Sequence, residues 1–233
     1  MFLHNKGMKK KEILTEIIEC LFEFDEDRGS SEDYTFNDFL GYLNARSAGD
    51  NIEIRKIRGD ESPDIGQDFS SASSDISILL VLMYRYAKGY IKKALKNSRL
   101  QTADEFSFLI TLMTYKSLTK TELINKQVME KTSGTEIIKR LENSGFISEA
   151  DDRNDKRSIR VSITDEGRAE IFHILPVMGV VSKIITGNLN GEEINTLSYL
   201  LKKLDYFHND IYMNRRKESL DNLVQEVQPY LPV

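Results

Sequence analysis

Apolar residues recur at helical spacing along most of the chain. Ile13, Ile17, Leu21 and Phe24 fall on one face of a helix over residues 8–24. The same spacing predicts further helices near residues 36–43, 76–98, 102–113, 119–128, 132–144, 165–186 and 190–216, the last continuing towards 227 in one interpretation. Alternating apolar and polar residues predict strands at 146–150 and 158–164, and more weakly at 51–57. We therefore predict a mainly α fold with a small β hairpin.

Helix boundary signals mark the middle of the chain most clearly. Thr102 precedes Glu105 by three residues, and Thr119 precedes Glu122 by three, which is the spacing of a capping box. The helix that opens at Thr132 ends at Gly145, which suits the left-handed position after a helix. Two short helices, a tight turn and a hairpin with a charged tip predict a winged helix-turn-helix lobe over about 102–167.

The side chains of this stretch suit contacts with the bases and phosphates of DNA. The first turns of the second helix carry hydroxyl, small and cationic residues, namely Thr132, Ser133, Gly134, Thr135, Lys139 and Arg140. Such groups bond base edges and phosphates, and we expect Gly134 to leave room for a close approach of the backbone. The hairpin tip carries Arg153, Lys156 and Arg157, which suit a phosphate or a narrow minor groove, and Asp155 can hold Arg157 in place. The alternative is that the tip is a solvated charged turn.

The run Asp152-Arg153-Asn154-Asp155-Lys156-Arg157, followed by a strand closing on Ile163-Thr164-Asp165-Glu166-Gly167-Arg168, resembles the wing of the MarR family of bacterial regulators. The resemblance covers roughly residues 75–216. It implies a homodimer whose winged helices bind successive half-sites of a pseudo-palindromic operator in double-stranded DNA. It also implies a repressor relieved by a small ligand, often an aromatic acid or phenol, bound between the dimer helices and the DNA-binding lobe. The family often has Arg where Asn154 stands.

Charge divides the chain unevenly. Residues 1–70 hold nine Lys and Arg against 16 Asp and Glu, a balance of −7, whereas the remainder holds 23 against 21, a balance of +2. The part of the chain predicted to bind DNA is therefore not repelled by a duplex overall. We predict an acidic helical extension and linker over 1–72 and a MarR-like domain over 73–233, with dimerisation helices at about 75–100 and 165–227. The absence of a long apolar run and the single thiol favour a cytoplasmic protein without a membrane span.

Other candidates carry weaker signals. Tyr84, Tyr86 and Tyr90 either line a ligand pocket or pack in the core, and Cys20 is either an oxidant sensor or inert. His4, His173 and His208 lack metal-ligand spacing, so neither a metal site nor a cofactor is expected. No nucleophile elbow or phosphate-binding loop supports a catalytic residue or an enzyme. A winged-helix protein-interaction module without specific DNA binding remains the alternative to a regulator.

Overall fold

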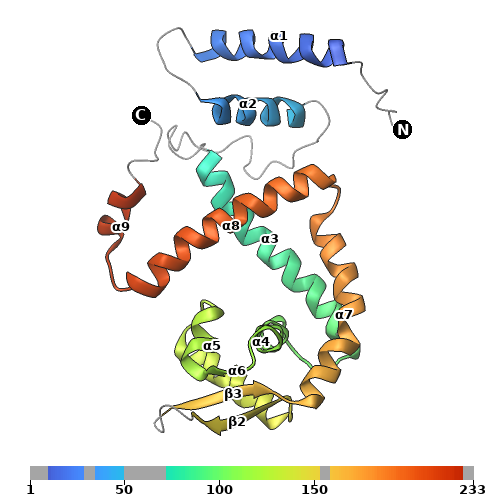
Figure 1. Cartoon of the computed structure of the whole chain (residues 1–233), viewed down its shortest axis with the longest axis vertical. Coiled ribbons are helices and arrows are strands. Elements are labelled where there is room, and N and C mark those ends of the chain that lie inside the picture. Colours follow the sequence, from blue (N-terminus) through green and yellow to red (C-terminus); the bar gives the residue numbers. More distant parts are fainter. Residues whose placement is uncertain (1–9, 29–34, 50–71, 153–157, 228–233) are drawn as a thin grey trace, which may run out of the picture. The chain divides into compact units, whose positions relative to one another are not determined.

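The computed structural model describes residues 10–28, 35–49, 72–152 and 158–227 (Figure 1). The chain divides into two compact units, Met1–Gln67 and Asp68–Val233, and each is described by itself. The strand predicted at 51–57 and most of the predicted linker lie outside the described residues.

The first unit is a pair of helices, α1 (Lys10–Arg28) and α2 (Phe36–Gly49). Its small core consists of Cys20, Phe24 and Phe39, with the Phe24 ring 5.6 Å from that of Phe39 and 5.1 Å from that of Tyr42. Helix α1 continues to Arg28, four residues past the end of the predicted helix. Residues 25–28 contain neither glycine nor proline, so nothing in their backbone ends the helix at Phe24.

The second unit contains the long helices and the winged-helix lobe. Its helices are α3 (Ala72–Ala94), the 3₁₀ turn η2 (Leu95–Asn97), α4 (Ala103–Thr114), α5 (Lys120–Lys126), α6 (Lys131–Asn143), α7 (Asp165–Thr186), α8 (Gly191–Asn214) and α9 (Leu220–Val227). Its strands are β1 (Leu118–Thr119), β2 (Ile147–Asp151) and β3 (Ile159–Ile163). Helix α8 ends at Asn214 and α9 begins at Leu220, so the last predicted helix does not continue unbroken to residue 227.

The sheet has the antiparallel order β1-β3-β2, with Leu118 opposite Val161 and Ile147 opposite Ile163. The short strand β1 was not predicted, because two residues are too few to show alternation. Val161 and Ile163 face the core as expected, but Ile159 is 42% exposed. It lies at the end of β3 nearest the wing tip, beyond the helices that cover the sheet.

One core joins the lobe to the long helices. Phe108, Leu112, Ile138 and Phe146 are among its fully buried members, and α7 extends the core through Ile171. Pro176 lies inside α7, where a proline often kinks or breaks a helix, but the helix continues through it. Side chains buried on both sides of the proline hold the helix together despite the lost backbone donor.

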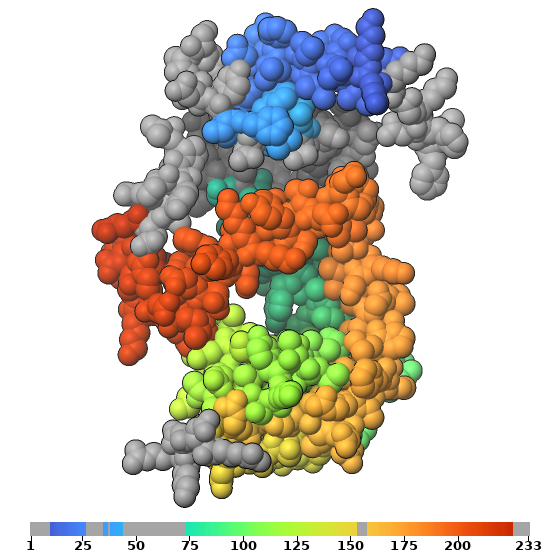
Figure 2. Space-filling view, in the orientation of Figure 1, coloured from blue at the N-terminus to red at the C-terminus, as the bar shows by residue number. Residues whose placement is uncertain are grey.

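The long helices leave wide apolar faces uncovered. Among the described residues of α8, none is buried, although Leu197, Leu200, Leu201 and Leu204 follow one another at helical spacing. Figure 2 shows an opening between the middle of α8 and the lobe, with α3 visible beside the opening, while the end of α8 reaches the lobe. By length and composition α7 is apolar enough to cross a membrane. Its buried side chains, among them Ile171, Ile174 and Val181, pack into the core of this unit.

Candidate nucleic-acid interface

Helix α6 presents one polar face outward and buries the other. Ile137, Ile138 and Leu141 pack into the core, while Thr132, Ser133, Thr135 and Lys139 are exposed. The Thr135 hydroxyl donates to the Lys131 carbonyl oxygen at 2.7 Å, and its oxygen can still accept hydrogen bonds. The helix begins one residue before the predicted Thr132, and its N-cap, Glu130, makes no side-chain capping bond. The first amides of α6 therefore remain able to bind an anion.

Gly134 has a different role from the one predicted. It is buried, and a Cβ placed on it would lie 2.5 Å from Cγ1 and 2.9 Å from Cγ2 of Ile124. The missing side chain therefore lets α6 pack closely on α5, and it does not clear a path for DNA. Gly134 belongs to the packing of the helix-turn-helix and not to its outer face.

Arg140 is likewise held by ion pairs within the lobe, although its side chain is 38% exposed. Its Nε donates to Oε1 of Glu105 at 2.9 Å and its Nη1 to Glu136 at 3.0 Å. Glu105 is only 4% exposed, and its other oxygen accepts the Gln101 amide at 2.7 Å. The predicted capping box at Thr102 is thus only half formed, because the Glu105 carboxylate turns to Gln101 and Arg140. Arg140 anchors α6 to the start of α4, so we assign it a positioning role.

The turn between α5 and α6 is held on the α4 side by Gln127. The Gln127 amide oxygen accepts from the Ser107 hydroxyl at 2.6 Å, and its nitrogen donates to the Thr111 hydroxyl at 2.7 Å. The next residue, Val128, has a φ of 49°. A β-branched residue seldom adopts this left-handed conformation, so tertiary contacts must stabilise the turn. Val128 was predicted as an apolar helix position, yet it is exposed in the turn.

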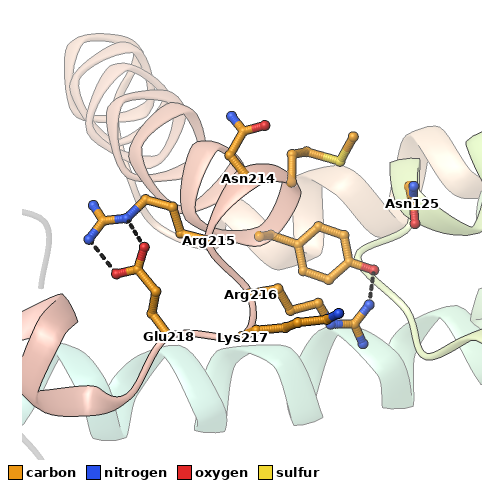
Figure 3. A pocket seen from close by; sticks show the side chains of 8 residues that line it. Asn125, Asn214, Arg215, Arg216, Lys217 and Glu218 are labelled. Carbon is orange, nitrogen blue, oxygen red and sulfur yellow. Dashed lines mark hydrogen bonds and ion pairs between the residues drawn. The ribbon is translucent and has the colours of Figure 1, made fainter.

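The end of α8 holds the same turn from the other side. The Tyr212 hydroxyl donates to the Met129 carbonyl oxygen at 3.0 Å, and Arg216 forms an ion pair with Glu130. Arg216 also lies over the Tyr212 ring and donates to its hydroxyl (Figure 3). These contacts join the long helix to the residues that begin the exposed helix α6. A hollow of about 480 Å³ lies beside them, lined mainly by residues 212–218.

The wing is ordered at its base by Arg160. Its guanidinium donates to Asp152 at 2.9 Å, to the Ser117 hydroxyl at 2.9 Å and to the Ser117 carbonyl oxygen at 2.7 Å. The Asp152 amide donates to the Ser158 carbonyl oxygen at 2.9 Å, which closes the hairpin. Arg160 lies within the strand predicted over 158–164, and no local signal in the sequence indicates its contacts with Ser117. The predicted tip residues Arg153, Asp155, Lys156 and Arg157 lie outside the described residues.

The three tyrosines of α3 do not surround one space. Tyr90 is half-buried and packs against the core, whereas Tyr84 and Tyr86 are 59% and 43% exposed. A hollow of about 250 Å³ lies one turn away from Tyr84 and is lined by Leu80, Val128, Leu201, Leu204, Asp205, His208 and Asn209. Its walls come from α3, α8 and the turn before α6.

Two remaining candidates are placed by the structure. Cys20 is buried between α1 and α2. His173 and His208 lie on different helices, and within the part of the chain that the structure describes no three His, Cys, Asp or Glu side chains form a metal-binding group.

The α5–turn–α6 unit and the three-stranded wing define a winged helix-turn-helix protein. The MarR family profile matches residues 102–159. The multiple antibiotic resistance protein MarR of Salmonella typhimurium is 35% identical over 107 residues, which are 44% of this chain and 72% of that protein. The transcriptional repressor NicR of Pseudomonas putida is 26% identical over 103 residues, covering 44% of this chain and 65% of NicR.

Structural similarity agrees with the sequence comparison. A crystal structure of a cysteine-to-serine mutant of MarR from Escherichia coli complexed with operator DNA superposes with a TM-score of 0.53 at 25% identity. The superposition covers 58% of this chain and 99% of that one. The chain belongs to the MarR family of winged-helix transcriptional regulators, and the predicted resemblance to that family is confirmed.

Proposed function

We propose that the protein is a homodimeric repressor that binds a pseudo-palindromic operator and releases it when a small aromatic ligand binds. The observation that carries the proposal is the outer face of α6, where Thr132, Ser133, Thr135 and Lys139 are exposed together. Their hydroxyls and ammonium bond base edges in a major groove, while the uncapped start of α6 faces phosphate. The similarity to NicR and to MarR solved with operator DNA supports the same function.

The wing completes the proposed contact. The Arg160–Asp152 pair fixes the two strands at the base of the hairpin, next to the sequence that carries Arg153, Lys156 and Arg157. We assign these three cations to phosphates or to the neighbouring minor groove, with Asp155 orienting Arg157. Arginine in a narrow minor groove responds to its strong negative potential.

A second copy of the chain is the proposed partner of the apolar faces on α3, α7 and α8. Exposed residues of these faces include Ile76, Leu79, Phe172, Val180, Leu197 and Leu200. Contiguous apolar surface on a soluble protein marks an interaction site. A symmetric dimer would set two α6 helices about one DNA turn, roughly 34 Å, apart.

The hollow lined by Leu80, Leu201 and Leu204 is the proposed ligand site. Its volume of about 250 Å³ exceeds the roughly 150 Å³ that holds one benzene ring in an apolar cavity. Asp205, His208 and Asn209 supply polar partners for an acid or phenol group. Val128 also lines the hollow, so a ligand there would press on the turn that positions α6. This assignment replaces the three tyrosines of α3 as the lining of a pocket.

Selection of bound sequences from a random duplex pool, followed by fluorescence anisotropy, tests DNA recognition. We expect Thr135→Ala and Lys139→Ala to change the preferred sequence. Arg157→Ala should weaken binding to every duplex and lower the salt slope by about one. Lys183→Ala is the matched control, because it removes an exposed cation about 27 Å along α7 from the wing.

Light scattering on the same samples measures the oligomeric state. A chain that prefers no duplex even at low salt would refute the proposal and favour a protein-interaction module. A monomer under all conditions would refute the dimer.

A further inference from the structure

Helix α1 keeps an uncovered apolar stripe after α2 has packed against it. Cys20 and Phe24 face α2, whereas Leu14, Ile18 and Phe22 are 60%, 53% and 66% exposed. These three recur every four residues and therefore lie on one side of the helix. Four of the five glutamates of α1, at positions 12, 16, 19 and 23, lie away from this stripe, and Glu26 follows Phe22 at its end, which leaves the stripe free of acids along its middle.

Charges close both ends of the stripe. Lys11 lies three residues before Leu14, and Asp25 lies three residues after Phe22, so the row 11, 14, 18, 22, 25 follows one side of the helix. The row is symmetric about Ile18: cation, apolar, apolar, apolar, anion. A cation near the start and an anion near the end of a helix are the reverse of what the helix dipole favours. The charges therefore gain little within a lone helix and suit a partner.

We propose that two copies of the chain pair through α1, antiparallel and centred on Ile18, so that the two helix pairs form a four-helix bundle. Reversal about Ile18 places Lys11 of each copy against Asp25 of the other. It places Leu14 against Phe22 and Ile18 against its own counterpart. The stripes of the two copies are therefore complementary in charge and in apolar contact, as a two-fold symmetric interface requires.

This pairing goes beyond the proposed operator-binding function and uses a separate surface. A dimer formed through α3, α7 and α8 would raise the effective concentration of the two α1 helices and favour their pairing. The inference does not depend on the winged helices, because every residue that carries it lies on α1.

Disulfide cross-linking of the full-length chain tests the geometry. In a Cys20→Ala background, Ile18→Cys should give a disulfide-linked dimer under mild oxidation. Leu14→Cys alone should not, because its two copies would lie about 12 Å apart along the axis, and disulfides need Cα atoms within about 7 Å. An equal mixture of Leu14→Cys and Phe22→Cys chains should form the mixed dimer. Glu16→Cys, on the acidic side, is the control that should remain monomeric on reducing-agent-free gels.

Charge exchange tests the pairing without altering the apolar stripe. Lys11→Glu should slow cross-linking of the Ile18→Cys chain about fivefold, since two exposed ion pairs become repulsive. Adding Asp25→Lys should restore the cross-linking rate. If Lys11→Glu had slowed the reaction only by unfolding the helix, the second change would not restore the rate.

Cross-linking of Leu14→Cys with itself would show a parallel pair and overturn the proposal. So would the absence of cross-linking by Ile18→Cys, which would place another partner or another part of the same chain on the stripe. A dimeric, DNA-binding chain that fails these tests refutes only the α1 pairing. A chain that passes them but binds no DNA refutes only the proposed function.

Discussion

Gly134→Ala tests how closely the exposed helix α6 is fitted to α5. The added methyl would lie 2.5, 2.9 and 3.0 Å from three carbons of the buried Ile124 side chain. Contacts this short force the two helices apart, and overpacking of this kind costs about 1–3 kcal/mol. Replacing glycine inside a helix returns about 1 kcal/mol. We therefore expect a net loss of up to about 2 kcal/mol in the free energy of unfolding.

Urea unfolding followed by circular dichroism, at one fixed protein concentration, measures this loss. Gly89→Ala is the matched control, because a Cβ there meets nothing within 4 Å, and it should leave stability unchanged or raise it by up to about 1 kcal/mol. Ile124→Ala removes the obstructing carbons and should cost about 2–5 kcal/mol alone.

The double variant decides whether the clash is the cause. With Ile124 truncated, the new methyl fills part of the cavity, so the double variant should be more stable than the sum of the two losses by about 1–2 kcal/mol. Losses that add to within about 0.5 kcal/mol would show that the two residues do not interact, and they would refute the reasoning.

Three further predictions follow from local contacts. Gly167→Ala should lower stability by more than Gly134→Ala, because its Cβ would meet the rigid backbone carbonyl of Phe146, and thermal unfolding compares the two. The hydrogen bond from the backbone amide of Thr119 holds the pKa of Glu122 below its ordinary value. The contribution of Glu122 to stability is therefore fully present above the ordinary pKa and is lost as the pH falls through the lowered pKa. Glu122→Gln should flatten the loss of stability below about pH 5 in acid titrations. Arg216→Ala should weaken operator binding several-fold, because the Glu130 carboxylate loses its ion-pair partner and repels the DNA phosphates. Adding Glu130→Gln removes that negative charge and should restore binding, as measured by anisotropy titrations.

Short-range signals in the sequence predicted most of the lobe. The Thr119–Glu122 capping box forms in full, and Gly145 takes a φ of 76° after α6, as predicted. Ile137 and Ile138 are buried as their spacing requires. These features depend on residues within one or two turns of each other, so a local pattern contains all the necessary information.

Long-range pairs could not be predicted in the same way. Glu105 and Arg140 are 35 residues apart, and nothing in either local pattern indicates that the buried carboxylate chooses Arg140 over its own capping box. Gly134 shows the same limit, because a glycine in a helix fits close approach of DNA or of another helix. Only the position of Ile124 distinguishes the two. The site residues that changed role are therefore those whose partners lie on a different helix.

Helix α8 connects the two halves of the proposed mechanism. Its leucines form part of the face proposed for the dimer and of the proposed ligand hollow, while Tyr212 binds the Met129 carbonyl at the turn before α6. Val128 has a φ of 49°, a conformation that only the surrounding contacts make favourable. We therefore expect the turn to respond to a displacement of α8 more readily than a turn without backbone strain would. A ligand that binds better to one position of α8 than to another would shift the population of DNA-binding geometries by that difference in affinity. Control in this arrangement needs no contact between the ligand and α6, because Tyr212 near the end of α8 already holds Met129 in the turn that leads into α6.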